Sequence, residues 1–410
     1  MTMTLREEAL KMHLENNGKI SVVSKVPIAN RHDLSVAYTP GVAEPCKDIK
    51  ENKDLSFEYT CRGNMVAVIS DGTRVLGLGD IGPEAAIPVM EGKAALFKTF
   101  SDVDAVPICL GTKDPEEFIR TVKLLEPNYA GINLEDISSP KCYDIECRLK
   151  EICDIPVFHD DQHGTAIACL SAVIGALRYV KKDFRTARFV VNGCGAAGSA
   201  IGRLLVSMGA QNVIMVDRFG ALYEGIDAKL DRIQSYLASV TNKERRQGSL
   251  ADVAKGADVL IGVSAPHVFT KEIMQSMAKD SVVFALANPV PETSYDEAKA
   301  AGVAVAGTGR SDRPNQVNNV TVFPGVFRGA IDVRARAITE EMKVAAVFAI
   351  SELIDEKDLR EDYVVPDAFD PRVAPAVAAA VAKTAIELGL ARKIVDPEIV
   401  KANTMKRVGR

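Results

Sequence analysis

The first third of the chain alternates short apolar runs with longer stretches of helical spacing. Short apolar runs that end in polar or turn residues are typical of buried strands, and we expect strands at 65–70, 105–110, 130–134 and 156–158. Residues 115–125, between two of these runs, repeat apolar positions at the helical period. This alternation of strands and helices indicates an α/β fold with largely parallel sheets.

An apolar helical stretch at 164–180 separates this region from a second one with the same alternation. The second region has an expected helix at 197–208 and expected strands at 188–192, 212–216, 259–263, 282–287 and 303–306. An alanine-rich amphipathic helix at 374–388 precedes a charged tail formed by the last twenty residues. Because 410 residues exceed what one core usually serves, we expect α/β domains over 1–160 and 161–390, followed by a charged tail over 391–410.

Composition excludes several classes of protein. The chain is 47% hydrophobic and 26% charged, with a net charge of −5, which argues against a nucleic-acid partner. We expect no membrane partner, because the apolar runs are interrupted before the ~18 residues that cross a bilayer. The first eleven residues contain acids and lack the apolar core of a signal peptide. None of the eight cysteines forms a Cys-x-x-Cys pair, as expected for reduced thiols in a cytoplasmic protein.

A glycine motif marks the start of the second domain. Residues 188–198 read R-F-V-V-N-G-C-G-A-A-G, which places G-x-G-x-x-G directly after a strand and at the start of a helix. Gly193 permits the tight turn, Gly195 lets a pyrophosphate approach the backbone, and Gly198 allows close helix–strand packing. Asp217, at the end of the next strand, is placed to accept hydrogen bonds from ribose hydroxyls. We therefore expect a Rossmann-type, doubly wound dinucleotide-binding domain rather than a glycine-rich turn without a ligand.

A second match to the same motif, G-L-G-D-I-G at 77–82, is a weaker candidate. It contains Asp80, whose negative charge would oppose a pyrophosphate. We reject this loop as the dinucleotide site, although it can still approach substrate or cofactor from the first domain.

Two apolar runs end in paired acids. Y-A-G-I-N-L-E-D ends at Glu135 and Asp136, and I-P-V-F-H-D-D ends at Asp160 and Asp161. If both runs are parallel strands, the four carboxylates lie at one edge of the sheet, where ligands bind in open α/β folds. Carboxylates so close repel one another unless they are protonated or bind a cation, and oxygen ligands favour Mg²⁺ or Mn²⁺. The alternative is a solvated acidic rim without a metal.

Two histidines flank the second acid pair. His159 and His163 have the i, i+4 spacing of a helical zinc site. Pro156 before them and Gly164 after them make a helical register doubtful. We expect both histidines to pack or to donate hydrogen bonds.

The motifs together resemble those of the malic enzyme family, particularly its short bacterial and archaeal members. The resemblance covers nearly the whole chain, and we see no departure at a family motif. The matching stretches are Y-T-P-G-V-A-E-P-C at 38–46, D-G-T-R-V-L-G-L-G-D-I-G at 71–82, P-V-M-E-G-K at 88–93, N-L-E-D at 133–136, H-D-D-Q-H-G-T-A at 159–166, A-N-P at 287–289 and N-N-V-T-V-F-P-G at 318–325.

This resemblance implies a role for each matching residue. Glu135, Asp136 and Asp161 would ligate the metal, and Asp160 would support Lys93, the general base. Tyr38 would be the acid that protonates the enol carbon. Malate would be bound by Arg74, Asn288 and Asn319, and the dinucleotide by Thr165, Gly193, Cys194, Gly195, Ala196, Ala197, Gly198, Asp217 and Asn318. Taken singly, Lys93 is typical of an exposed helix lysine and Tyr38 of a packing residue in a turn.

The activity that the resemblance implies is oxidation of L-malate by NAD(P) and its decarboxylation to pyruvate, dependent on Mg²⁺ or Mn²⁺. Lys93 must be neutral to act as a base, and a nearby dication and burial would both lower its pKa. Asp217 favours NAD because it repels the 2′-phosphate of NADP, whereas Arg218 could offset that charge. The family also implies a homodimer.

Alternative functions differ from this one in what they require of these residues. Malolactic conversion and oxaloacetate decarboxylation use the same scaffold and remain open. A non-catalytic nucleotide sensor would need neither a base nor a metal site. A metal-dependent hydrolase would have no use for the dinucleotide motif.

Overall fold

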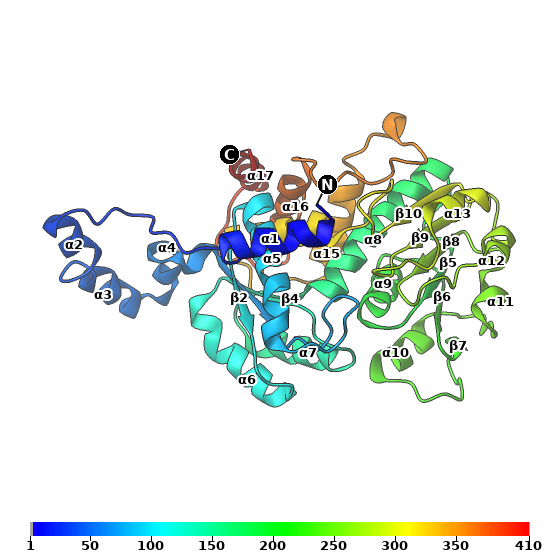
Figure 1. Cartoon of the computed structure of the whole chain (residues 1–410), viewed down its shortest axis with the longest axis horizontal. Helices are drawn as coiled ribbons and strands as arrows, with labels where there is room; N and C mark the ends of the chain where they lie inside the picture. Colours follow the sequence, from blue (N-terminus) through cyan, green and yellow to red (C-terminus); the bar gives the residue numbers. More distant parts are fainter. Residues whose placement is uncertain (1–2, 410) are drawn as a thin grey trace.

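Two sheets organise the protein, and the computed structural model describes residues 3–409 (Figure 1). The first sheet has four parallel strands in the order β2-β1-β3-β4. Its strands are β1 (Met65–Ser70), β2 (Asp104–Cys109), β3 (Gly131–Leu134) and β4 (Val157–His159). The helices that connect them are α5 (Pro83–Ser101), α6 (Pro115–Leu125) and α7 (Lys141–Ile152). Because all four strands are parallel, their carboxyl ends meet at one edge, as the sequence predicted.

Helix α8 (Asp160–Val180) connects the two sheets. It begins four residues earlier than expected, with Asp160 and Asp161 in its first turn, where the helix dipole favours negative charge. His163 is therefore helical, contrary to our doubt about its register. The helix is also long and apolar enough, by length and composition alone, to cross a membrane, which differs from our reading of the apolar runs. Most of its residues are buried inside the protein, as in the core helix of a globular domain.

The second sheet has six strands in the order β10-β9-β8-β5-β6-β7, all parallel except the short β7. The strands are β5 (Arg188–Asn192), β6 (Asn212–Asp217), β7 (Gly220–Ala221), β8 (Val259–Gly262), β9 (Val282–Ala285) and β10 (Val305–Thr308). The helices are α9 (Ala196–Ser207), α10 (Arg232–Val240), α11 (Leu250–Ala254), α12 (Lys271–Ser276) and α13 (Tyr295–Ala300). Strand β5 lies between β6 and β8, so the chain reverses direction across the sheet beside β5, which is where doubly wound folds bind ligands.

The C-terminal helices return to the first domain. They are α14 (Phe323–Asp332), α15 (Glu340–Ser351), α16 (Val373–Glu387) and α17 (Pro397–Val408), and α14, α16 and α17 all pack against α5. Phe97 of α5 contacts Phe323 of α14 edge to face, with ring centroids 4.7 Å apart. The expected charged tail is therefore a docked helix, because Val400 and Thr404 on α17 are buried. The many charged side chains of α17 make its sequence pattern polar, so the pattern did not indicate the buried face formed by Val400 and Thr404.

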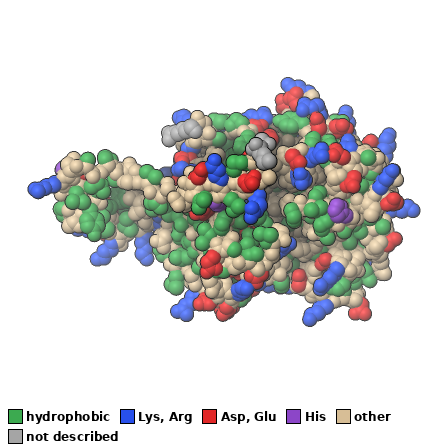
Figure 2. All heavy atoms as spheres, in the orientation of Figure 1, with side chains coloured by type: hydrophobic (Ala, Val, Ile, Leu, Met, Phe, Trp, Pro, Cys, Tyr) green, Lys and Arg blue, Asp and Glu red, His purple; other side chains and the backbone are tan. Residues whose placement is uncertain are grey.

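An N-terminal arm projects from the body (Figure 1). Helix α1 (Leu5–Asn16) lies across the body, and the arm comprises α2 (Arg31–Ala37), α3 (Ala43–Glu51) and α4 (Ser56–Tyr59). Neither α2 nor α3 has a buried residue, and hydrophobic side chains cover much of the arm surface (Figure 2). Short 3₁₀ helices complete the fold: η1 (Lys53–Leu55), η2 (Cys61–Asn64), η3 (Glu126–Asn128), η4 (Asn319–Thr321) and η5 (Glu356–Asp358).

Candidate active site

A cavity of about 650 Å³ lies between the two domains, where the carboxyl ends of both sheets face each other. It is lined from the first domain by α5 and the segment after β3, and from the second by the turn after β5 and the segment after β9. Twelve residues predicted from the sequence line it: Arg74, Lys93, Glu135, Asp136, Asp161, Thr165, Gly195, Ala196, Ala197, Asn288, Asn318 and Asn319. The tertiary structure thus brings together residues separated by more than half the chain.

Three carboxylates converge on one side of the cavity. Glu135, Asp136 and Asp161 each place an oxygen within 4.8 Å of the others. Asp136 has a left-handed φ of 54°, which few non-glycine residues adopt, and its backbone N–H donates to Asp161 Oδ2 at 2.8 Å. Its own Oδ2 is buried and has no hydrogen-bond partner among the described residues. Buried oxygen donors with an unsatisfied oxygen fit a hard divalent cation such as Mg²⁺ or Mn²⁺.

The electrostatics of these carboxylates agree with that fit. Burial, together with the negative charges of Asp161 and Glu135, raises the pKa of Asp136 to about 9. Burial also raises the pKa of Asp161 to about 6, with the Lys93 ammonium opposing the shift. The protein alone therefore does not stabilise three negative charges at this position. A bound dication would stabilise them.

Lys93 of α5 is buried beside this cluster. Its Nζ lies 2.7 Å from Asp160 Oδ2 and 3.0 Å from Glu135 Oε1, and 4.3 Å from the centre of the Phe323 ring. Burial alone would lower the pKa of Lys93, but Asp160 and Glu135 outweigh it and raise the pKa above its ordinary value. This differs from the lowered pKa that we expected. A cation that neutralises the carboxylates would weaken their attraction for the Lys93 ammonium. Burial would then lower the pKa of Lys93.

Asp160 lies behind the cavity and holds two residues that face it. Its Oδ2 accepts hydrogen bonds from Lys93 Nζ and from the amide of Asn319. Burial raises the pKa of Asp160 to about 7 against the opposing charge of Lys93. Gly164, one turn along α8, is required by this arrangement, because a Cβ there would lie 1.9 Å from Asp160 Oδ1.

The glycine turn after β5 has the expected geometry. Gly193 has a φ of 111°, and a Cβ on Gly198 would lie 1.8 Å from the Gly193 carbonyl oxygen. Gly193 and Gly198 shape the turn, and Cys194 is buried within it, so these three do not line the cavity. Gly195 has open space around it, and α9 begins at Ala196, which offers the N–H groups of its first turn to an anion.

Asp217 lies at the carboxyl end of β6, beyond the cavity. Its Oδ1 accepts from the backbone N–H of Arg218 at 2.8 Å, and its Oδ2 accepts from the Gln234 amide at 2.5 Å. Gln234 also closes the capping box of α10 with Asp231. Our sequence reasoning did not single out Gln234, although the D-x-x-Q spacing at the start of α10 is a recognisable signal.

The second glycine motif reaches the cavity from the first domain. A Cβ on Gly77 would lie 2.8 Å from Pro289, so this loop touches the segment that carries Asn288. Asp80 points to the surface, where it pairs with Lys113 at 2.7 Å. The loop therefore meets the second domain beside the cavity, at the segment that carries Asn288.

The two histidines stabilise the start of α8. His163 Nε2 lies 2.7 Å from Glu146 Oε1, and its Nδ1 lies 3.0 Å from the buried Lys343 Nζ. Burial lowers the pKa of His163 to about 3 despite the Glu146 charge. His159 is fully buried and has no hydrogen-bond partner for its ring among the described residues, so it packs.

Two further residues support the cavity and escaped the sequence reasoning. Asn133 donates to Glu135 Oε2 at 2.9 Å and lies in the N-L-E-D motif, so a signal was present. Glu292 is fully buried and accepts from the backbone N–H groups of Ser264 and Ala287, which line the cavity. No local pattern marks Glu292, because its partners lie on two other loops.

Tyr38 does not reach this cavity. It lies on the arm between α2 and α3 and is 65% exposed. The structure of one chain therefore does not bring Tyr38 to Lys93 and the carboxylates.

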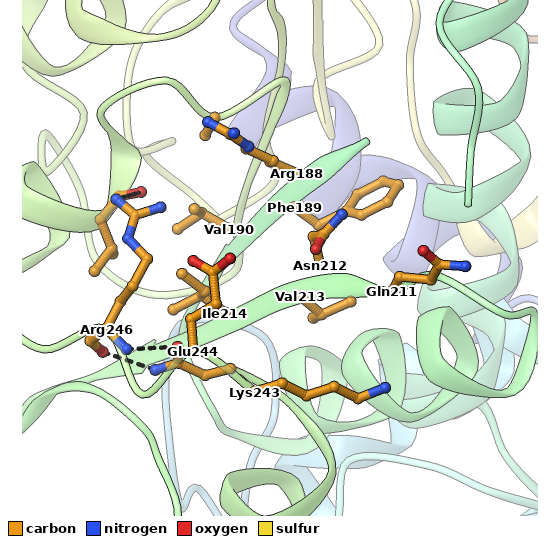
Figure 3. Close-up of a pocket in the computed structure, with 13 residues that line it drawn as sticks. Arg188, Phe189, Val190, Gln211, Asn212, Val213, Ile214, Lys243, Glu244 and Arg246 are labelled. Atoms are coloured by element: carbon orange, nitrogen blue, oxygen red, sulfur yellow. Dashed lines mark hydrogen bonds between the residues drawn. The ribbon is translucent and has the colours of Figure 1, made fainter. Parts of the chain in front are cut away.

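A second hollow in the dinucleotide domain is unrelated to this site (Figure 3). It measures only about 50 Å³ and lies at the amino ends of β5 and β6, opposite the glycine turn. Asn242 and Arg246 close one side of it through two hydrogen bonds of 2.7 and 2.9 Å.

The fold and the cavity define a class of protein, a two-domain dinucleotide-binding oxidoreductase whose first domain supplies a buried lysine and a carboxylate cluster. Residues 17–150 match the family of the malic enzyme N-terminal domain, and residues 162–386 match that of the malic enzyme NAD binding domain. The chain belongs to the malic enzyme family.

Known relatives cover nearly the whole chain. A protein named bifunctional malic/malolactic enzyme from Bacillus subtilis (strain 168) is 57% identical over 98% of both chains. The NAD-dependent malic enzyme of Geobacillus stearothermophilus is 51% identical over 95% of this chain and 81% of its own. The crystal structure of malic enzyme from Pyrococcus horikoshii Ot3 is similar, with a TM-score of 0.96 and 46% identity over 99% of this chain and 96% of that one.

Proposed function

We propose that this protein oxidises L-malate with NAD and decarboxylates the product to pyruvate and CO₂, with Mg²⁺ or Mn²⁺ as cofactor. The observation that carries the proposal is the convergence of Lys93 with Glu135, Asp136 and Asp161 on a cavity that also contains the dinucleotide turn. A base, a cation site and a hydride acceptor site are the three requirements of this reaction.

The residues divide the chemistry among them. Lys93 would take the proton from the C2 hydroxyl while Asp160, which also accepts from Asn319, holds the ammonium group in position. Arg74, Asn288 and Asn319 line the cavity and would bind malate, since a guanidinium pairs with a carboxylate and amides donate to its oxygens. The divalent cation, held by the three carboxylates, would supply a Lewis acid at the C2 oxygen. Gly195, Ala196 and Ala197 would hold the dinucleotide, which would supply the acceptor for the hydride of C2.

The direct test is spectrophotometric. Purified protein with L-malate and Mn²⁺ should increase the absorbance at 340 nm with NAD, and pyruvate should form in equal amount. Excess chelator should abolish both signals. The Asp161→Ala variant should bind the metal much more weakly than the wild type does, because it lacks one of three proposed ligands. Full turnover after removal of the metal would contradict the assignment.

NAD is the proposed preferred cofactor, and NADP remains possible. The proposal is supported by Asp217, whose carboxylate is held at the end of β6 by Gln234 and the Arg218 backbone, where it would repel a 2′-phosphate. The relatives include an NADP-dependent malic enzyme from Escherichia coli (strain K12), which is 46% identical over 96% of this chain. Separate assays with the two cofactors decide between them.

A second candidate activity is malolactic conversion of malate to lactate. It is favoured by the name of the Bacillus subtilis relative at 57% identity. Pyruvate reduced by the bound dinucleotide before release would give lactate without net NADH. The discriminating measurement is the ratio of lactate to pyruvate at fixed malate consumption. Oxaloacetate decarboxylation, the other alternative, would proceed without any change at 340 nm.

The arm supports the proposal of a homodimer. Helices α2 and α3 have no buried residue, so the arm contains no core of its own to hold it in place. Val36 and Tyr38 are exposed there although both are apolar enough to favour burial. A partner chain that covers the arm would bury these side chains. We infer that the arm of one protomer completes the cavity of its partner with Tyr38, which would then protonate C3 of the product.

Mixing two variants that are defective in pyruvate formation tests this arrangement. Tyr38→Phe and Lys93→Ala should each slow the conversion of malate to pyruvate at every site of their own homodimer. If Tyr38 acts across the interface, a mixed dimer contains one site with both wild-type residues, so co-refolded chains regain activity. If Tyr38 acts within its own chain, every site in the mixture has one defect and activity stays at the level of the separate variants. A monomer in solution would overturn the homodimer.

A further inference from the structure

A second cavity, of about 310 Å³, lies on the far side of the first domain from the active site. It is lined by cationic side chains from several elements, and we call it the basic cavity; its cations are Lys25, Arg328, Arg334, Lys393 and Arg407. Helix α5 starts at the carboxyl edge of the sheet and runs back to Asp102, which also lines the basic cavity. The basic cavity therefore lies near the amino edge of the sheet, opposite the carboxylate cluster.

Positive charge exceeds negative charge in the basic cavity. Arg328 is 2% exposed and donates to Asp332 and, at 2.6 Å, to Asn64 Oδ1. Arg407 donates to the same Asp332 at 3.1 Å, so one carboxylate serves two guanidinium groups. Lys393 has no ion pair and no side-chain hydrogen bond within residues 3–409.

Lys25 pairs with Asp104 outside the lining at 3.2 Å, and Asp104 also pairs with Lys98. Arg334 has only distant acids, with Asp54 and Glu58 both at 3.8 Å. Asp102, the remaining acid of the lining, is paired with Lys98 outside the cavity at 2.6 Å. The basic cavity therefore contains more cationic groups than carboxylates that can neutralise them.

Two guanidinium nitrogens in this region lack an acceptor within the described part of the chain. The Nε atoms of Arg328 and Arg334 are buried and donate to no partner there. Burial lowers the pKa of Arg328, and the charge of Arg407 lowers it further, against the opposing effect of Asp332. A buried N–H donor without a partner destabilises the folded protein. An anion bound to the guanidinium groups of Arg328 and Arg334 would offset that cost.

We propose that the basic cavity is a binding site for a small organic dianion, either a phosphate monoester or a dicarboxylate. Both present paired oxygens to guanidinium groups, which bind them through charge-assisted hydrogen bonds. The cavity joins Phe57 and Glu58 at the base of the arm to Lys393 and Arg407 near the C-terminus. A dianion in the basic cavity ties the base of the arm to α17.

Calorimetry on the full-length protein tests the binding. The probes are glycerol 3-phosphate, succinate and inorganic phosphate, with chloride at equal ionic strength as the reference and chelator present to weaken binding at the active site. Glycerol 3-phosphate or succinate should bind more tightly than chloride. The probe with the higher affinity shows whether the site prefers a phosphate monoester or a dicarboxylate. Binding of no probe above the chloride reference overturns the proposal.

Variants separate this cavity from other sites. Arg407→Gln and Lys393→Gln keep the fold because both side chains lie at the rim, and each should weaken binding by at least ~10-fold, as expected for one charge-assisted hydrogen bond. Lys406→Gln, beside Arg407 on α17 but outside the cavity, is the matched control and should bind as wild type does. Equal affinity in all three variants overturns the assignment to this cavity.

Hydrogen exchange tests the link to the arm. The probe should slow amide exchange in residues 53–64 of the wild type and of Lys406→Gln, and should leave Arg407→Gln unchanged. Binding without any slowing at 53–64 overturns the link. These measurements need no turnover, so they are independent of the proposed malate reaction.

Discussion

Lys93 and Asp160 form a buried ion pair, with Lys93 Nζ 2.7 Å from Asp160 Oδ2. Lys93 lies on α5 and Asp160 is the first residue of α8, so the pair fixes two helices relative to each other. It also directs the ammonium to the cavity that contains the carboxylate cluster. Removal of either partner would leave an uncompensated buried charge, which is strongly destabilising.

Replacement of Lys93 tests its role as the base. Lys93→Ala should lower malate-dependent reduction of the dinucleotide by at least ~10²-fold, the usual loss for a positioned general base. Mn²⁺ binding should persist, because Lys93 is not one of the proposed ligands. Circular dichroism and a thermal melt separate loss of the base from loss of stability, since Lys93→Ala leaves the Asp160 carboxylate without its ion pair. Lys98→Ala, an exposed lysine on the same helix, is the matched control and should turn over normally. Near wild-type turnover of Lys93→Ala would exclude it as the base.

The carboxylate cluster should make metal binding depend on pH. The pKa values of Asp161, about 6, and of Asp136, about 9, lie above their ordinary range, so a metal must displace protons to bind. Affinity for Mn²⁺, measured by titration calorimetry, should therefore fall as the pH is lowered from 8 to 5.

The same shifts set the direction of the stability change. A carboxyl whose pKa is raised by folding binds more protons in the folded state, so stability without metal decreases as the pH rises from about 4 to about 9. The increase in Tm on adding Mn²⁺ should accordingly grow with pH. Asp136→Asn should lose this increase and the surface variant Glu244→Gln should keep it. An Mn²⁺ effect that is independent of pH would argue against ligation by these groups.

Cofactor preference should follow Asp217. We expect kcat/KM for NAD to exceed that for NADP by at least ~10-fold, since an acid at this position repels the 2′-phosphate. Asp217→Ser should narrow or reverse the ratio, and Arg218→Ser should widen it because the offsetting charge is lost. Gln234→Leu releases one oxygen of Asp217 and should weaken NAD binding with little change in kcat. A wild-type preference for NADP would mean that Arg218 outweighs Asp217.

Tyr38→Phe should separate the two halves of the reaction. The variant keeps the ring and loses only the hydroxyl, so the arm should pack as before. Pyruvate formation from malate should slow, whereas reduction of oxaloacetate to malate, which needs no proton at C3, should be largely retained. Both rates are measured with saturating cofactor and Mn²⁺. Equal losses in the two reactions would remove the case for Tyr38 as a dedicated acid.

Much of the fold could be read from local patterns. The strands at 65–70 and 188–192 and the helix at 115–125 have the predicted bounds, because buried parallel strands and amphipathic helices have distinct periods. The other expected strands were shifted by one or two residues, since hydrogen-bonding partners rather than hydrophobicity decide where a strand ends, and the two-residue β7 was not expected. The start of α8 was misjudged because Asp160 and Asp161 read as a strand end, whereas the helix dipole stabilises them in a first turn.

The sequence by itself determined the glycine turn after β5, the acid at Asp217 and the acid pairs at strand ends, because each depends on neighbours close along the chain. Only the tertiary structure decided which of these groups meet. Asp160 joins Lys93 from 67 residues away and Asn319 from 159 residues away, through the packing of α5, α8 and η4. The tertiary structure also decided that the last residues dock as α17 and that Tyr38 lies outside the cavity of its own chain. Such contacts arise from the packing of whole helices and sheets, and no local period encodes them.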